Sequence, residues 1–165
     1  MSRNFKTQLA GQIGESLVVA ELGRRGIVAT SFTGNVPDID ILAYRAGKTL
    51  SLQVKAIRSG SVSFDAKRYM KLEFQGDRQV IAQQESDTND EMVIVFVAIG
   101  AVRGSDRFYL IRHSELRDII FRNHGAWLSK HGGIRLRNPK STHTAVSLED
   151  LEAFQGNWAL VEDLL

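Results

Sequence analysis

The chain has 165 residues, of which 43% are hydrophobic and 24% charged, a balance that suits one compact core and excludes a disordered or fibrous protein. It contains no cysteine, which excludes disulfides and thiolate metal sites. The formal net charge is only +2, and the sequence shows no leader-like or membrane-spanning apolar segment. We therefore expect a single cytoplasmic domain over residues 1–165 with no membrane partner.

The first periodic segment predicts a helix over residues 6–25, where apolar residues recur at helical spacing and Gly26 follows two basic residues. Glu15 falls within an apolar stripe of this helix, beside Val18 and Leu22. Burying a carboxylate costs several kcal/mol unless it is paired or bound to a cation. Glu15 is therefore expected either to form a salt bridge in the core or to take part in a cation site.

A β-hairpin is predicted next, after a short strand over residues 27–32 and a Thr33-Gly34-Asn35 loop. The runs 36–44 and 49–57 alternate between polar and apolar residues, with a turn at residues 45–48 between them. Each run therefore predicts a strand with one polar and one apolar face.

The register of this hairpin follows if the turn is symmetric about its two central residues. Asp40 then faces Gln53, and Asp38 faces Lys55, with all four side chains on one side. Opposed side chains lie within about 5 Å at Cβ, close enough for their oxygens to share one cation. Mg²⁺ prefers oxygen ligands and keeps several waters, so Asp40 and Gln53 would suffice with a main-chain carbonyl. Lys55 beside a metal-bound water could stabilise hydroxide, and Asp38 is either a second ligand or the partner of Lys55.

The remaining elements are predicted with less regular patterns. The segment 61–74 is expected to form irregular strand or hairpin, and 76–86 a short helix. A buried strand is predicted over 91–99, a partner strand over 107–111, and a helix over 114–131. They are followed by an edge strand at 142–146, a short helix capped by Ser147 and Asp150, and the core anchors Phe154, Trp158 and Leu160.

Basic residues concentrate in the middle of the chain. Between residues 101 and 140, nine Lys and Arg outnumber three acids, whereas residues 149–165 hold five carboxylates and no Lys or Arg. A polyanion should therefore lie against the middle segment, although scattered solvated charges explain the pattern equally well. The candidate nucleic-acid-binding residues are Arg112, Arg122, Lys130, Arg135, Arg137 and Lys140.

The order of Glu15, then Pro37-Asp38-Ile39-Asp40, then Gln53-Val54-Lys55 resembles the PD-(D/E)XK nuclease superfamily, which includes restriction enzymes and archaeal Holliday-junction resolvases. The resemblance covers about the first third of the chain and the strand order that follows. It implies an α/β restriction endonuclease-like fold, with a mixed β-sheet flanked by helices in an αβββαβ core. We place the core sheet and first helix in residues 1–112, and C-terminal helices with an edge strand in 113–165.

The resemblance also implies roles for individual residues. Asp40, Gln53, Lys55 and Glu15 would be catalytic, and Asp40, Gln53, Glu15 and Asp38 would be the metal candidates. Gln53 departs from the family pattern, because an amide replaces the usual Asp or Glu and removes one negative charge. Glu15, which matches a metal-contacting Glu on the first helix of many relatives, would restore that charge.

The functional hypothesis is endonuclease-like hydrolysis of phosphodiester bonds in DNA with Mg²⁺ or Mn²⁺, in repair, recombination or defence. The alternative is a catalytically inactive nuclease-fold module that binds nucleic acid or a protein partner. A homodimer would allow a hydrolase with one site to cut both strands together.

Overall fold

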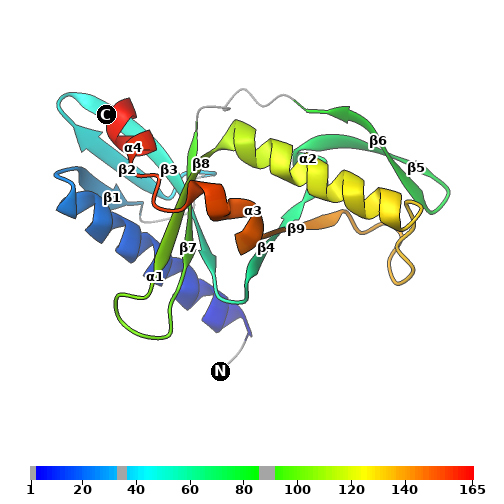
Figure 1. Ribbon diagram of the computed structural model, residues 1–165, viewed down its shortest axis with the longest axis horizontal. Helices are drawn as coiled ribbons and strands as arrows, with labels where there is room; N and C mark the ends of the chain where they lie inside the picture. The colour runs from blue at the N-terminus through cyan, green and yellow to red at the C-terminus, as the bar shows by residue number, and fades with distance from the viewer. Residues whose placement is uncertain (1–2, 33–36, 86–91) are drawn as a thin grey trace.

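The computed structural model describes residues 3–32, 37–85 and 92–165. The helices and strands form a five-stranded mixed sheet with helices on both faces and two further strand pairs (Figure 1). In chain order the elements are α1 (Arg3–Arg24), β1 (Val28–Ser31), β2 (Ile41–Arg45), β3 (Lys48–Ile57), β4 (Ser61–Asp65), η1 (Ala66–Arg68), β5 (Met70–Gln75), β6 (Arg78–Gln84), β7 (Val93–Ala98), β8 (Arg107–Arg112), α2 (His113–Lys130), β9 (His143–Ser147), α3 (Leu148–Leu151), η2 (Glu152–Phe154) and α4 (Ala159–Leu164).

The central sheet has the strand order β1-β2-β3-β7-β8. Its first three strands form an antiparallel meander, β3 pairs with β7 in parallel, and β8 returns antiparallel to β7. The first ladder pair of β2 and β3 joins Ile41 to Leu52, whereas β3 continues along β7 as far as Ile57. The edge of β3 beyond Leu52 is therefore open to groups that approach from the side of β2.

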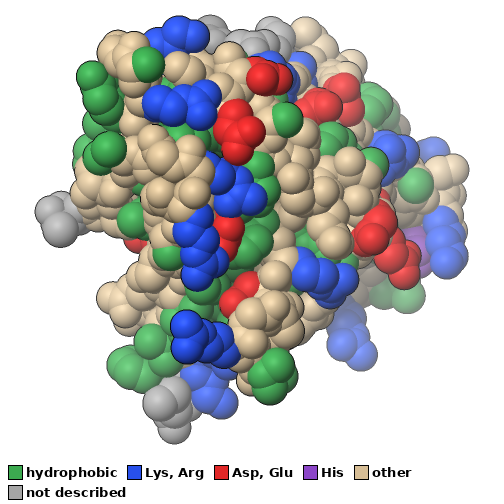
Figure 2. Space-filling view, turned by 60° about the vertical axis from the view of Figure 1, so that its left-hand side comes forward, with side chains coloured by type: hydrophobic (Ala, Val, Ile, Leu, Met, Phe, Trp, Pro, Cys, Tyr) green, Lys and Arg blue, Asp and Glu red, His purple; other side chains and the backbone are tan. Residues whose placement is uncertain are grey.

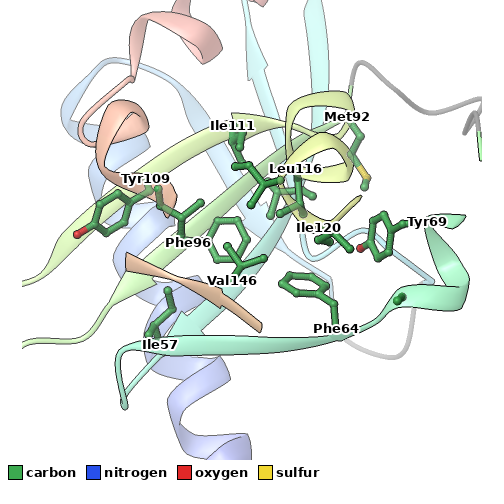
Figure 3. Close-up of a cluster of buried hydrophobic side chains, with 14 of the residues drawn as sticks. Ile57, Phe64, Tyr69, Met92, Phe96, Tyr109, Ile111, Leu116, Ile120 and Val146 are labelled. Carbon is green, nitrogen blue, oxygen red and sulfur yellow. The ribbon is translucent and has the colours of Figure 1, made fainter. Parts of the chain in front are cut away.

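Two hydrophobic cores lie on the two faces of this sheet. On one face, Val18 and Leu22 of α1 and Val161 of α4 pack against the sheet; on the other, α2 packs together with β4 and β9. All six residues of β7 are buried, as expected for a strand covered on both faces. Figure 3 shows the α2 side, where Phe64 and Val146 point toward Phe96. The rings of Phe64 and Phe96 meet edge to face, 6.2 Å apart.

The helix α1 lies close to the sheet at Gly14. A Cβ atom at Gly14 would lie 3.3 Å from the Cβ of Ala56 and 3.4 Å from a methyl of Val54. The absence of a side chain at Gly14 therefore lets the helix backbone approach β3 closely. This contact places Glu15, the next residue, at the border between helix and sheet.

The observed fold confirms the predicted mixed sheet flanked by helices with a helical C-terminal part. The capping box of Ser147 and Asp150 is present, and Trp158 is buried as expected. The helix predicted over 76–86 is wrong, because Arg78–Gln84 form β6 and pair with β5. No helix in the described ranges combines the length and apolarity needed to cross a membrane.

The strand predicted from residue 36 is also wrong in its first part. Val36 and the Thr33-Gly34-Asn35 loop lie outside the described residues. Pro37 and Asp38 form a turn, and the φ of Asp38 is +61°, so regular strand begins only at Ile41. Short polar side chains such as Asp tolerate this left-handed conformation better than most, which alternation of residue types does not reveal.

Candidate active site

The hairpin of β2 and β3 has the predicted register. Ile41 lies opposite Leu52 and Arg45 opposite Lys48, so the turn is centred on Ala46 and Gly47. Both turn residues have positive φ, +50° and +88°, as in the two-residue turns whose twist matches that of paired strands. The turn therefore fixes which residues of the two strands approach each other at the far end.

Asp40 is held at the open edge of β3. Its amide donates to the carbonyl of Leu52 over 2.9 Å, and its carboxylate accepts a 2.7 Å hydrogen bond from the amide of Val54. Asp40 thus continues the hairpin by one residue beyond β2. Its carboxylate lies at the backbone between Gln53, which the sequence predicts opposite Asp40, and Lys55.

Asp38 occupies a different position from the one predicted. It forms an ion pair with Arg68 over 2.9 Å, and no ladder pairing joins it to Lys55. The hydrogen bond from Arg68 holds the pKa of Asp38 below its usual value against the opposing effect of desolvation. A hydrogen bond from Gln53 and the charge of Lys55 lower that pKa further. The left-handed turn redirects Asp38, but the residue still lies among the other candidates.

Glu15 reaches the same cluster from α1. It is half-buried, and no ion pair joins it to a described residue, so the core salt bridge considered for it is not formed there. Burial raises the pKa of Glu15, and the negative charge of Asp40 raises it further. The two carboxylates therefore repel each other, and a bound cation would relieve that repulsion.

These side chains have the chemistry of a hard-cation site. Glu15 and Asp40 offer carboxylates, and Gln53, which is 8% exposed, offers an amide oxygen. Mg²⁺ and Mn²⁺ take such oxygen ligands together with waters. No three His, Asp or Glu side chains of the described residues converge as a metal-binding group, and Asp38 is paired with Arg68. The donors present fit a divalent ion that keeps several water ligands.

Arg68 is the residue of this cluster that sequence reasoning missed. It ends η1, thirty positions beyond Asp38, and its side chain is 64% exposed. No local pattern links these two residues. Predicting the pair would have required knowledge of the path of β4, because this strand brings the chain back toward the start of β2.

The six basic candidates for nucleic-acid binding do not all lie in one place in the structure. Arg112 lies at the start of α2, and Arg122 in the middle of that helix pairs with Asp150 over 3.4 Å. Four residues gather where α2 ends and the chain turns toward β9; they are Lys130, Arg135, Arg137 and Lys140. Arg112 and Lys130 are about 27 Å apart along the helix at 1.5 Å per residue.

The loop between α2 and β9 is braced by an aromatic stack. Trp127 lies between His131, whose ring is stacked 4.3 Å away, and the Arg135 guanidinium, 4.0 Å from the ring centroid. Lys140 lies 4.7 Å from the centroid of Phe74 and donates to the carbonyl of Gly76. Arg135 and Lys140 therefore hold the loop in place, whereas Lys130 and Arg137 are exposed.

The side of the molecule that holds α1, β1 and β2 is rich in cations. Figure 2 brings this side forward and shows a row of Lys and Arg side chains with carboxylates between them. The surface on this side is thus one of mixed charge, in which acidic groups lie among basic ones.

No family model matches the sequence, and no curated protein matches it. A solved structure of a bacterial homing endonuclease, I-Ssp6803I, matches the fold with a TM-score of 0.53. The sequence identity is 14%, and the match covers 95% of this chain and 93% of the other. At this identity the likeness concerns the fold, and it extends over nearly the whole chain.

Proposed function

We propose that this protein hydrolyses phosphodiester bonds in DNA with the help of a divalent metal ion. The observation that carries the proposal is the position of the Asp40 carboxylate at the open edge of β3, between Gln53 and Lys55 and near enough to Glu15 for their charges to interact. The PD-(D/E)XK resemblance of these residues supports it. The endonuclease activity named for the structure of similar fold supports it further.

Glu15, Asp40 and Gln53 would hold Mg²⁺ or Mn²⁺. When bound, such an ion polarises the phosphate and lowers the pKa of a water ligand. Lys55 donates to the attacking water or the phosphate oxygens and balances the charge that builds up during attack. Because Gln53 is neutral, two carboxylates carry all the negative charge of this donor set.

Asp38 and Arg68 have a separate role in this proposal. Asp38 orients the Arg68 guanidinium through their ion pair, so that Arg68 can receive a phosphate of the substrate. Asp38 thereby acts as a positioning residue. The Gln53 amide that also contacts Asp38 links this pair to the metal donors.

DNA outside the reaction centre would be held by the basic residues at the end of α2 and on the following loop. Lys130 and Arg137 are exposed and free to contact phosphates, and Arg135 and Lys140 shape the loop that carries them. Such contacts are independent of sequence and sensitive to salt. The salt dependence of DNA affinity is therefore the quantity that tests them.

The experiment is cleavage of supercoiled, branched and single-stranded DNA by the purified protein in Mg²⁺ or Mn²⁺. Lys55→Ala is expected to lower the rate at least ~100-fold, the usual contribution of a positioned acid or base. Asp40→Ala should lower it at least as much, because it removes one of the two carboxylate ligands of the metal. Lys48→Ala, an exposed change at the other end of β3, should cut at the normal rate. Absence of cleavage on every substrate, or cleavage that survives both changes, contradicts the proposal; DNA binding without cleavage would instead favour an inactive binding module.

A further inference from the structure

A cleft of about 410 Å³ opens beside the candidate active site, between the N-terminal half of α1 and the strands β3 and β4. Its walls are small and apolar and include Ala10, Gly11, Val54 and Ala56. Lys55 also lines it. The cleft therefore adjoins the proposed reaction centre, because the amide of Val54, another lining residue, donates to the Asp40 carboxylate.

The cleft exists because α1 separates from the sheet within one helical turn. At Gly14 an added Cβ would meet Ala56 at 3.3 Å, whereas at Gly11 it would meet nothing within 4 Å. The helix thus lies directly on β3 at Gly14 and leaves a gap at Gly11. The space is open to a ligand, and no described side chain fills the position that Gly11 leaves empty.

The charged residues that line the cleft are all cations. Lys6, Lys55 and Arg58 line it, and it has no acidic lining residue among those described. Neither Lys6 nor Arg58 forms an ion pair with a described residue. Three cations around an apolar floor suit a ligand that combines anionic groups with an apolar body.

The size of the cleft limits which part of a nucleic acid could enter. Its volume lies near the lower end of the range of about 300–1,000 Å³ for small-molecule sites, enough for about one nucleotide. A paired base is covered by its neighbours and cannot enter such a recess, whereas an unpaired base can leave the stack. The phosphates on either side would meet the three cations.

We propose that this cleft binds one unpaired nucleotide of a DNA strand whose adjacent phosphate lies at Asp40 and Lys55. The preferred substrate is then DNA with a single-stranded region, and intact duplex binds more weakly. This inference rests on the proposed function, because it assigns the cleft to the strand that the site would cut. It adds the requirement that a base be unpaired beside the reacting phosphate.

Gly11→Leu tests the proposal by filling the cleft from within. The new side chain enters open space, and leucine favours the helix more than glycine does, so the fold should be retained. Gly23→Leu is the matched control, since Gly23 lies on the same helix, is also free of contacts within 4 Å, and is outside the cleft. Circular dichroism verifies that both variants are folded.

The readout is fluorescence anisotropy of labelled oligothymidylate and of a labelled blunt duplex, measured in EDTA so that no strand is cut. The unaltered protein should bind the single strand more tightly than the duplex at the same salt concentration. Gly11→Leu should weaken single-strand binding about tenfold or more, the effect of losing about 1.4 kcal/mol, and change duplex binding less than about twofold. Gly23→Leu should alter neither.

Three results overturn the proposal: an unaltered protein that prefers the duplex, a Gly11→Leu variant that binds the single strand normally, or one that loses both ligands equally. Because these measurements need no catalysis, they are separate from the test of hydrolysis. A protein that cuts DNA while Gly11→Leu binds normally keeps the proposed function and loses the nucleotide cleft. A protein that cuts nothing can still show the cleft by selective binding.

Discussion

Two carboxylates with unequal surroundings define the chemistry of the candidate site at the residue scale. The Asp40 carboxylate accepts a hydrogen bond from the Val54 amide, whereas Glu15 is half-buried and faces the charge of Asp40. The raised pKa of Glu15 means that its ionised form opposes folding. Its contribution to stability is fully present below the unfolded value of 4.5 and is lost as pH rises through the higher folded value.

Replacing Glu15 by glutamine should therefore stabilise the metal-free protein at neutral pH. We expect Glu15→Gln to raise the Tm in EDTA by ~1–3 °C, the size of shift that a change below about 1 kcal/mol gives in a chain of this length. The Tm increase on adding Mg²⁺ should disappear, because one carboxylate ligand is gone. Glu152→Gln, at an exposed position, serves as the control. A lower Tm for Glu15→Gln in EDTA would mean that Glu15 has a stabilising partner.

The sequence predicted part of this site because the symmetry of one short turn determines it. The register that brings Asp40 to Gln53 follows from counting outward from Ala46 and Gly47. Asp38 could not be placed in the same way, since a left-handed residue breaks the alternation. Its partner Arg68 arrives through tertiary structure that no local pattern encodes.

At the scale of elements, the end of α2 and the loop to β9 form a unit separate from the proposed reaction centre. Figure 1 shows this loop at the end of the long axis away from α1. Its internal contacts, above all those of Trp127 with Arg135, stiffen it. A stiff loop can present Arg137 to a phosphate with little loss of conformational entropy on binding.

Neutralising two exposed cations of this unit should reduce the electrostatic part of DNA binding. Lys130→Gln with Arg137→Gln is expected to lower the slope of log K against log salt by ~2, since each phosphate contact contributes about 0.9. Arg103→Gln, in the turn between β7 and β8, should leave the slope unchanged. Anisotropy titrations at several salt concentrations provide the measurement, and an unaltered slope in the double variant would remove this loop from the binding surface.

The elements that sequence patterns misjudged are those whose structure depends on distant partners. Residues 78–84 are rich in Gln and show no regular alternation, yet they form β6 because β5 pairs with them across the Gly76 turn. By contrast, β7 was evident from its unbroken apolar run, and α1 from its helical spacing. Local periodicity thus determines β7 and α1, whereas β6 depends on its pairing with β5.

At the scale of the whole molecule, the two cores on either side of the sheet differ in the ionisable groups that they enclose. The α1 side places its ionisable groups at the border of the core, whereas the α2 side encloses His124 completely. Neither ring nitrogen of His124 has a hydrogen-bond partner in the described part of the chain. Burial, aided by the charge of Arg135 and opposed by that of Asp65, lowers the pKa of His124 from 6.5 to about 4.

Acidification should therefore weaken the fold well above the range where carboxylates titrate. The unfolded chain binds a proton at His124 near pH 6.5 and the folded chain only near pH 4, so stability falls as pH decreases between these values. The free energy of unfolding from urea titrations should drop by ~2–3 kcal/mol between pH values of about 7.5 and 4.5. His124→Leu should remove most of that drop, and His131→Gln, at an exposed position, should keep it. An equal drop in His124→Leu would assign it to other groups.

The bond from the Val54 amide to the Asp40 carboxylate also provides a spectroscopic probe. A backbone proton that is hydrogen-bonded to a carboxylate has a chemical shift that depends on the charge and ligands of that carboxylate. In isotope-labelled protein, the Val54 resonance would thus report the arrival of a metal ion or a phosphate at Asp40. One amide signal would record occupancy of the site even in a variant that has lost all chemistry.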